Sequence, residues 1–521
     1  MKIETKHLYS LTLLYFIVSY IGILHHEFFI DEAHHWLLAR DSGSIADLVK
    51  NTRIEGHPLM WSVLLYAITR FTANPFWMQF LHILISSSVV FLFLRKAPFS
   101  FVFKVLFIFG YFIIFEFNLI SRNYILGILF LFLACSVFEQ RNRKFILLST
   151  FLALASNTHL MFSVIAFALF LTLLLENFVK KQFFRREFLI GYFIFGIGLC
   201  AIIKQIQYTD SSWLIDPINS MPFGERLVKG YIAFFKGLVT IPDFRTLYFW
   251  NSNFIVNFNR PLAAVLALLV YFLPLLLFFK NKKTLFFVYT ALIGTQIFFF
   301  VTQRAATRFH GMTYIIWIVA LWIEYYYASE SYKLKDFILS KKLDLLKNPI
   351  VYTILIIQFC SGIYAYAMDF KYQFTSAKET VDYLRKEQLS DKEIVSVTCD
   401  GTIVSAYLER KIWFLCDGGY ESFCHWDSGC AGNITSAKAL VLLSDYMLSH
   451  DNAIFVSYYP LSNKLQPNVW QPFNDKIRFR FLKKFDCNIV DKSYYYIFEV
   501  STQLENQIHK PLSVIETNPL N

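Results

Sequence analysis

Residues 260–280 read RPLAAVLALLVYFLPLLLFFK, and two more lysines, Lys282 and Lys283, follow closely. The hydrocarbon core of a bilayer is about 30 Å thick, and a helix needs about 20 predominantly apolar residues to cross it. This run has that length and carries charge only at its two ends. It therefore predicts a membrane-spanning helix whose lysine-rich end faces the cytoplasm.

The same pattern recurs along the chain. Further apolar runs are 8–24, 77–94, 99–117, 119–138, 144–158, 159–177, 188–206, 284–302, 309–327 and 349–368. The first of them is long for a signal peptide and is not followed by a small-residue cleavage pattern, so we expect an uncleaved span. Together the runs predict a polytopic α-helical membrane protein with about eleven transmembrane helices.

The composition agrees with a membrane protein. Of the 521 residues, 56% are hydrophobic and only 17% are charged, against about 25% charged residues in a soluble globular domain. There are 58 Phe residues, and the mean hydropathy is +0.45. These values exclude a soluble enzyme, a disordered chain and a disulfide-stapled miniprotein. The net charge of +11 requires no nucleic-acid partner, because Lys and Arg of membrane proteins concentrate in cytoplasmic loops.

The basic residues set the expected orientation. They gather between alternate apolar runs, at Lys2, Lys6, Arg95, Lys96, Lys104, Arg141, Arg143, Lys144, Lys180, Lys181, Arg185, Arg186, Lys280, Lys282, Lys283, Lys333, Lys335, Lys341, Lys342 and Lys347. If these face the cytoplasm, the first large outer loop is 27–76 and the second is 207–259. We therefore expect a multi-pass protein of the plasma (inner) membrane, with its C-terminal region on the extracytoplasmic, periplasmic side.

Residues 57–72 (HPLMWSVLLYAITRFT) form an apolar stretch that conflicts with this orientation. A crossing here would invert every later loop and place the basic clusters outside, against the positive-inside rule. We therefore expect this stretch to form a helix on the outer surface, or a shallow re-entrant one.

The composition becomes more polar near residue 370, which divides the chain into a transmembrane region (1–370) and an extracytoplasmic region (371–521). Short apolar strands are expected at 393–398, 453–458 and 493–500, and helices at 376–387 and 436–449. This alternation predicts a small α/β domain.

Five cysteines fall in the extracytoplasmic region: Cys399, Cys416, Cys424, Cys430 and Cys487. Because five is odd, at least one is unpaired within the chain, and one or two disulfides are expected with their connectivity open. The other three, Cys135, Cys200 and Cys360, lie in apolar runs and are expected to be small core residues.

The first outer loop concentrates ionisable residues. Residues 28–61 read FFIDEAHHWLLARDSGSIADLVKNTRIEGHPLMW. Asp31 and Glu32 directly follow an apolar stretch at the membrane edge, where ionisable groups are costly and tend to be functional. The charges of Asp41, Asp47 and Lys50 are those of an ordinary solvated loop.

The two adjacent histidines, His34 and His35, point to different faces of a helix and lack the i, i+4 spacing of a shared metal site. We expect them to pack or to form hydrogen bonds.

A second set of polar residues lies at the predicted outer ends of later spans. It comprises Glu116, Arg122, Asn123, Tyr124, Asn157, His159, Arg304, Arg308 and His310. Arginines often reach from a helix end to the interface without any further role. Several cationic turns on the same expected face as a carboxylate pair instead suit a donor with an anionic leaving group and an acceptor that must be deprotonated.

The order DEA…ARD…EGHP, then SRNY, then RFHG resembles the GT-C glycosyltransferases, and most of all the bacterial relatives of glycosyltransferase family 39. That group includes protein O-mannosyltransferases and the aminoarabinose transferases that modify lipid A. The resemblance covers about 1–370. It implies a GT-C-like fold and an inverting transfer of a sugar from a polyprenyl-phosphate donor to an extracytoplasmic acceptor on a glycan, lipid or protein.

The resemblance also implies roles for individual residues. Asp31 would be the catalytic base and Glu32 would support it. The family motifs also fall on His57 and on the turn with Arg122 and Tyr124. The reaction itself needs cations beside the departing phosphate, and the candidates are Arg308, His310 and Arg122. The further candidate substrate-binding residues, from the loop and the span ends, are Glu55, Glu116 and His159, with His57 and Tyr124. No cofactor is implied.

The motifs depart from the family pattern at two positions. Leu59 stands where a second proline usually follows His57 and Pro58. Asn123 stands where metal-dependent members of the wider superfamily carry an Asp, so we do not expect a bound divalent metal.

Two aspects stay open in the sequence. Trp36, Trp61, Tyr124 and Trp213 suit either stacking on sugar faces or anchoring at the membrane interface. The alternative function is a multispan transporter or a flippase for lipid-linked sugars. A polar cavity at the outer face would favour a transferase, and one at the midplane would favour a transporter.

Overall fold

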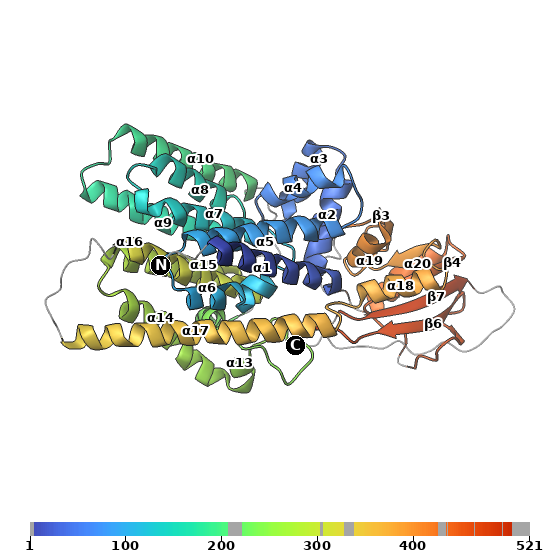
Figure 1. Ribbon diagram of the computed structural model, residues 1–521. Helices are drawn as coiled ribbons and strands as arrows, with labels where there is room; N and C mark the ends of the chain where they lie inside the picture. Colours follow the sequence, from blue (N-terminus) through green and yellow to red (C-terminus); the bar gives the residue numbers. More distant parts are fainter. Residues whose placement is uncertain are drawn as a thin grey trace. The chain divides into compact units, whose positions relative to one another are not determined.

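The computed structural model describes residues 5–206, 221–302, 306–327, 338–425, 434, 436–462, 464–491 and 493–502, without the side chains of 54 and 338–344. The chain forms two compact units (Figure 1). The helical unit comprises Met1–Leu24, Gly56–Trp61 and Gln79–Met368. The sheet unit comprises His25–Glu55, Ser62–Met78 and Asp369–Asn521. The sheet unit is therefore assembled from segments that lie far apart in the sequence.

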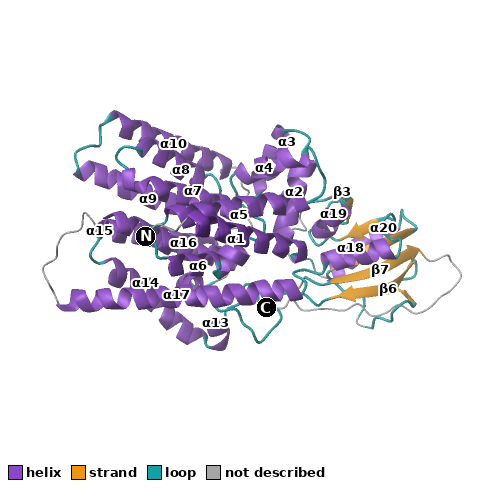
Figure 2. Ribbon diagram, viewed as in Figure 1, coloured by secondary structure: helices purple, strands orange, loops and turns teal. Residues whose placement is uncertain are grey.

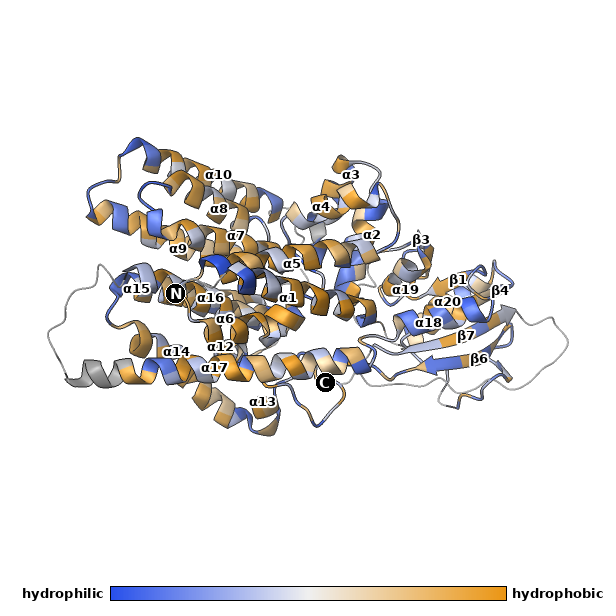
Figure 3. Ribbon diagram, viewed as in Figure 1, coloured by the Kyte–Doolittle hydropathy of each residue, from blue (hydrophilic) through white to orange (hydrophobic). Residues whose placement is uncertain are grey.

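Long apolar helices dominate the helical unit, as the hydropathy colours show (Figure 3). Seven helices in the described part of the chain are long and apolar enough to cross a membrane: α1 (Thr5–His25), α5 (Phe76–Lys96), α9 (Leu160–Val179), α10 (Arg186–Ile206), α14 (Arg260–Phe278), α15 (Lys282–Thr302) and Leu345–Lys371 of α17 (Ile338–Lys371). This confirms the predicted class of multi-pass helical membrane protein. The count of about eleven spans stays a prediction.

Three further helices occupy predicted spans. They are α7 (Tyr124–Val137), α8 (Phe145–Ser156) and α16 (Thr307–Tyr327). Sixteen of the 21 residues of α16 are buried. Because its surface is covered by protein rather than exposed, α16 is a central helix of this unit.

The predicted continuous span 99–117 is wrong. The helix α6 (Phe101–Ile108) ends early and is followed by a five-residue π-helix, Phe112–Glu116, and then by irregular chain up to Tyr124. The Phe117 amide bonds the Phe112 carbonyl, the i to i−5 pattern of a π-turn. The interruption follows from the polar side chains between Glu116 and Asn123, which are buried here and need partners that a plain apolar helix lacks.

The segment 207–259, predicted as the second large outer loop, contains an amphipathic helix, α12 (Phe223–Leu238), and a short one, α13 (Phe254–Phe258). The apolar side of α12 packs against Ala263 and Ala267 of α14. At Gly237 an added Cβ would lie only 2.3 Å from the His310 backbone oxygen of α16. Glycine is therefore required for this close approach of α12 to α16.

The sheet unit is a seven-stranded mixed sheet with helices (Figure 2). Its strand order is β3-β2-β1-β4-β7-β6-β5. The strands are β1 (Ile394–Ser396), β2 (Ile412–Phe414), β3 (Gly419–Glu421), β4 (Asn452–Ser457), β5 (Trp470–Pro472), β6 (Ile477–Phe485) and β7 (Tyr495–Thr502). The central strand β1 pairs in parallel with β2 and β4, and β7 pairs antiparallel with β4 and β6. The predicted small C-terminal α/β region is confirmed.

Helices from both ends of the chain complete the sheet unit. The C-terminal ones are α18 (Ala377–Lys386), α19 (Gly401–Leu408) and α20 (Ser436–Met447). The first loop contributes α2 (Ile30–Asp41) and α3 (Ile45–Asn51), and α2 packs against α19. A disulfide joins Cys399 to Cys424, and Cys487 is free, as the odd cysteine count requires of at least one residue.

The apolar stretch 57–72 forms α4 (Met60–Thr69), a helix of 10 residues. At 1.5 Å per residue this helix is about 15 Å long, half the thickness of the hydrocarbon core. The length agrees with a helix that does not cross.

The topology yields a labelling prediction. The background is a variant in which the exposed cysteines Cys200, Cys360 and Cys487 are replaced by serine. An added Arg95→Cys substitution should stay unlabelled by an impermeant reagent applied to intact cells. A cysteine at Asp475, which is exposed in the sheet unit, should be labelled. Labelling of the Arg95→Cys variant from outside would contradict the eleven-span topology.

Candidate functional site

The Glu32 side chain has a structural role at the start of α2. It lies at the third position of α2, is fully buried, and its Oε2 accepts the Phe29 backbone N–H at 2.9 Å. The same oxygen lies 3.4 Å from His26 Nε2. A carboxylate that returns to the N-cap backbone is one half of a capping box and stabilises the helix start. Glu32 therefore fixes the direction in which α2 leaves the preceding segment.

His26 is held between two carboxylates. Its Nδ1 lies 2.8 Å from Asp369 Oδ2, on the opposite side from Glu32. Burial opposes the charge of the ring, but Asp369 and Glu32 outweigh burial and raise the pKa of His26 to about 10. His26 is thus an imidazolium that joins the first loop to the end of α17.

This imidazolium predicts a pH dependence of stability. The pKa of His26 rises from 6.5 to about 10 on folding, so its stabilising contribution is complete below pH 6.5 and disappears as the pH rises to about 10. The thermal midpoint of the full-length protein in detergent should therefore fall across this interval. A His26→Gln variant should show a shallower fall, and equal slopes for the two proteins would contradict the assignment.

Asp31 is less buried than its neighbour Glu32 and lies in the first turn of α2. It interacts electrostatically with Glu55, whose Oε1 lies 2.6 Å from His34 Nε2. Burial opposes the charge of Glu55, but His34 more than compensates and lowers the pKa of Glu55. The His34 Nδ1 accepts the Cys424 N–H at 3.2 Å, so this histidine has the hydrogen-bonding role that the sequence predicts.

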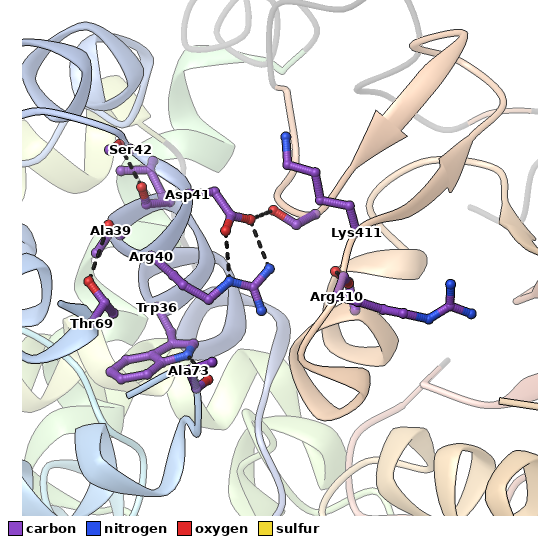
Figure 4. Close-up of polar contacts among 12 residues, drawn as sticks. Trp36, Ala39, Arg40, Asp41, Ser42, Thr69, Ala73, Arg410 and Lys411 are labelled. Atoms are coloured by element: carbon purple, nitrogen blue, oxygen red, sulfur yellow. Dashed lines mark hydrogen bonds and ion pairs between the residues drawn. The ribbon is translucent and has the colours of Figure 1, made fainter. Parts of the chain in front are cut away.

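Asp41 is not the solvated loop charge that the sequence suggests. Its carboxylate accepts two hydrogen bonds from Arg40, at 2.7 and 2.8 Å, and another from the Ser422 hydroxyl (Figure 4). It thereby links the end of α2 to the segment after β3. Asp47 and Lys50 are exposed, as expected.

The tryptophans of the first loop are core residues rather than interface anchors or sugar platforms. Trp36 is fully buried, and its Nε1 donates to the Ala73 carbonyl at 3.1 Å (Figure 4). Trp61 is also buried and packs edge-on against His82. Trp213 and Arg304 lie outside the described residues.

In the helical unit, the irregular chain after α6 contains Glu116, a buried carboxylate that interacts with two arginines. Glu116 Oε2 accepts hydrogen bonds from Tyr111 at 3.2 Å and from Trp250 Nε1 at 3.1 Å. Its Oε1 is buried and has no hydrogen bond within the part of the chain that the structure describes. Arg308 and Arg122 both interact electrostatically with this carboxylate. We call Glu116, Tyr111, Trp250, Arg122 and Arg308 together the Glu116 cluster.

Three other predicted site residues adjoin one another in the same unit. The Tyr124 hydroxyl lies 3.4 Å from His159 Nε2, and the His57 ring lies 4.8 Å from the His159 ring. His159 also caps α9, because its Nδ1 accepts the Met161 N–H at 3.0 Å. The Arg122 guanidinium lies 5.5 Å from the Tyr124 ring, which connects this group to the Glu116 cluster. Residues from four stretches that lie far apart in the sequence are thus connected inside the helical unit: His57, Arg122 with Tyr124, His159 and, through Glu116, Arg308.

His310 lines a cavity of about 310 Å³ bounded by α12, α13, α14, α15 and α16. Arg308, two residues earlier, interacts electrostatically with both His310 and Glu116. The cavity also contains Lys229, Lys236 and Arg260, which the sequence reasoning did not select. The signal for the two lysines was the amphipathic pattern of residues 223–238, where both fall on one side at i, i+7 spacing.

Comparison with known proteins adds no assignment. No protein-family model and no curated protein sequence matches the chain. Within the residues that the structure describes, no group of three or more His, Cys, Asp or Glu side chains is placed to hold a metal ion.

Proposed function

We propose that this protein is an inverting glycosyltransferase that moves a sugar from a polyprenyl-phosphate donor to an acceptor hydroxyl, or another nucleophile, outside the cytoplasm. One observation carries the proposal: the Glu116 cluster, in which Arg122 and Arg308 flank a buried carboxylate inside a unit of membrane-spanning character. Burying this much charge among apolar helices is costly, so such groups mark functional sites by default. The resemblance to GT-C glycosyltransferases supports the same reaction.

The chemistry needs one base and one cationic site. The base removes the proton of the acceptor hydroxyl, whose oxygen then bonds the anomeric carbon while the bond to the phosphate oxygen breaks. The negative charge that develops on the departing phosphate is stabilised by fixed cations. In the proposal, Arg308 and Arg122 supply that stabilisation, His310 contributes a hydrogen bond, and Glu116 orients the two arginines.

Asp31 is the proposed base because the resemblance to GT-C glycosyltransferases assigns that role to it, at the start of the first predicted outer loop. Glu32 and Glu116 have structural roles instead. The Glu32 carboxylate is bonded to the Phe29 amide and faces His26. The Glu116 carboxylate accepts two hydrogen bonds and neutralises arginines.

The position of the cavity favours a transferase over the alternative transporter or flippase. Its lining includes Arg260 at the start of α14, Phe299 near the end of α15 and His310 near the start of α16. The cavity therefore lies at the ends of these helices, which the charge pattern predicts to be the outer ends. Transporters usually hold their substrate near the middle of the helices.

The test uses the purified full-length protein with a panel of polyprenyl-phosphate sugars and no other enzyme. The expected result is transfer, or slow hydrolysis, that releases polyprenyl phosphate and inverts the anomeric configuration. Absence of release from every donor, together with movement of the lipid-linked sugar across proteoliposomes, would establish the flippase instead.

A further inference from the structure

The cavity beside His310 combines an apolar wall with a cationic one. Ile232 and Ala233 of α12, Val256 of α13 and Phe299 of α15 supply the apolar wall. Lys229, Lys236, Arg260 and His310 supply the polar one. Its volume of about 310 Å³ is at the lower limit for a small-molecule site.

The positive charges of this cavity outnumber the carboxylates near it. Glu225 lies 3.8 Å from Lys229 and 3.5 Å from Arg260, so one carboxylate serves two cations. Lys236 makes no side-chain hydrogen bond or ion pair with any residue in the described ranges. Three cations against one carboxylate leave a net charge of about +2 that attracts an anion.

After Lys236, His310 is the second polar side chain of the cavity with an unused hydrogen-bonding atom. Its side chain is 2% exposed, and its Nδ1 is buried without a hydrogen-bond partner in the described part of the chain. Buried polar atoms are nearly always bonded, so His310 retains an unused hydrogen-bonding position beside the cavity that it lines. The close crossing at Gly237 holds the backbones of α12 and α16 in contact, which keeps Lys236 and His310 on the same cavity.

The surroundings of the cavity suit a lipid. Its neighbour α14 exposes a stripe of large apolar side chains, namely Leu262, Val265, Leu268, Leu269 and Phe272. Figure 3 shows α14 as one of the strongly hydrophobic helices. An apolar surface next to a cationic pocket fits a ligand with a hydrocarbon chain and a phosphate at its end.

We infer that this cavity binds the phosphate of a membrane-embedded lipid phosphate, with Lys236 and His310 as its inner contacts and Lys229 and Arg260 at its rim. The inference rests on the proposed function, because it assigns the place where the donor, or the polyprenyl phosphate product, is held. It adds Lys236 as a phosphate-binding residue on a helix that lies outside every predicted span.

The ionisation of Lys236 predicts a pH dependence of phosphate binding. Burial lowers the pKa of Lys236 to about 8. The charged groups that share its cavity are Lys229 on α12 and Arg260 on α14, with Glu225 shared at the rim, and the titratable His310 on α16 lies beside them. A bound phosphate would stabilise the ammonium form, so affinity should decline as the pH rises above about 8.

The test measures binding of a short-chain polyprenyl phosphate to the full-length protein in detergent, with inorganic phosphate and the corresponding polyprenol as comparison probes. Lys236→Met should weaken lipid phosphate binding about tenfold or more, since a buried charged contact is lost. Lys236→Arg should restore most of the affinity. Lys204→Met, an exposed position on α10, is the matched control and should bind like the native protein.

The comparison probes separate the sources of the phosphate. Preference for the lipid phosphate over both probes supports the inference. Equal binding of polyprenol, equal binding of inorganic phosphate, or unchanged affinity in a folded Lys236→Met protein would overturn it. Thermal midpoints of the variants show which proteins are folded, and an Arg260→Gln variant supplies a second measurement if Lys236→Met unfolds.

The two proposals fail separately. If sugar transfer occurs but Lys236→Met changes neither affinity nor KM, the cavity assignment is overturned and the transferase stands. If lipid phosphate binds through Lys236 but no donor releases its sugar, the transferase is overturned and the lipid-phosphate site stands.

Discussion

An Asp31→Asn variant is expected to bind donor normally and to transfer sugar about 10²–10⁴-fold more slowly than the native protein. The substitution keeps the size of the side chain and its place in the first turn of α2, but removes its ability to accept a proton. The measurement is kcat for transfer and the donor affinity, each at normal expression and thermal stability. Asp47→Asn, at an exposed position of the same loop, is the matched control.

Glu32→Gln should behave differently from Asp31→Asn. It weakens the bond to the Phe29 amide and the contact with His26, so the thermal midpoint should fall while the turnover of the folded fraction changes less. Near-normal turnover of Asp31→Asn would refute the assignment of the base and leave Glu32 and Glu116 as the residues to test.

Replacement of Arg308 by Gln is expected to lower kcat by about 10²–10³-fold, the usual effect of removing one stabilising donor from a site where charge develops. Arg308 interacts electrostatically with both Glu116 and His310. Its replacement therefore removes the positive charge that these two residues share. The effect should appear mainly in kcat, because the interaction strengthens as the phosphate departs.

Two controls distinguish chemistry from stability in the Arg308 experiment. Arg308→Lys retains the charge without the forked geometry and should lose less activity than Arg308→Gln. Arg143→Gln changes an exposed arginine and should have no effect. A folded Arg308→Gln protein with native kcat would show that this arginine does not stabilise the leaving phosphate.

Hydropathy and strand patterns predicted most elements of the fold. Runs such as 260–280 and 284–302 correspond closely to α14 and α15, because a long uncharged apolar segment has few alternatives to a spanning helix. The strands β1, β4 and β7 also lie where their apolar patterns predicted them. The break between Ile108 and Tyr124 was missed, since it arises from tertiary hydrogen bonds of Glu116 that a local pattern does not contain.

The sequence selected several residues that the structure brings together, but it did not indicate their partners. His57, Tyr124 and His159 were selected from separate motifs, and the structure brings them together. Lys236 was missed because a lysine on an amphipathic helix is ordinarily a solvent-facing charge. Its place beside His310 in the same cavity goes with the crossing of α12 and α16 at Gly237, which only the folded chain reveals.

The discontinuous sheet unit has a consequence for biosynthesis. The segment His25–Glu55 leaves the ribosome early, but the residues that complete its fold begin only at Asp369, including the aspartate that holds His26. At about 5–20 residues per second, the first loop waits roughly 15 to 60 s for them. During that interval His26 lacks its partner Asp369, and His34 lacks the Cys424 amide. A chain interrupted before Asp369 would therefore insert its helices yet leave this loop as an unassembled target for quality-control proteases.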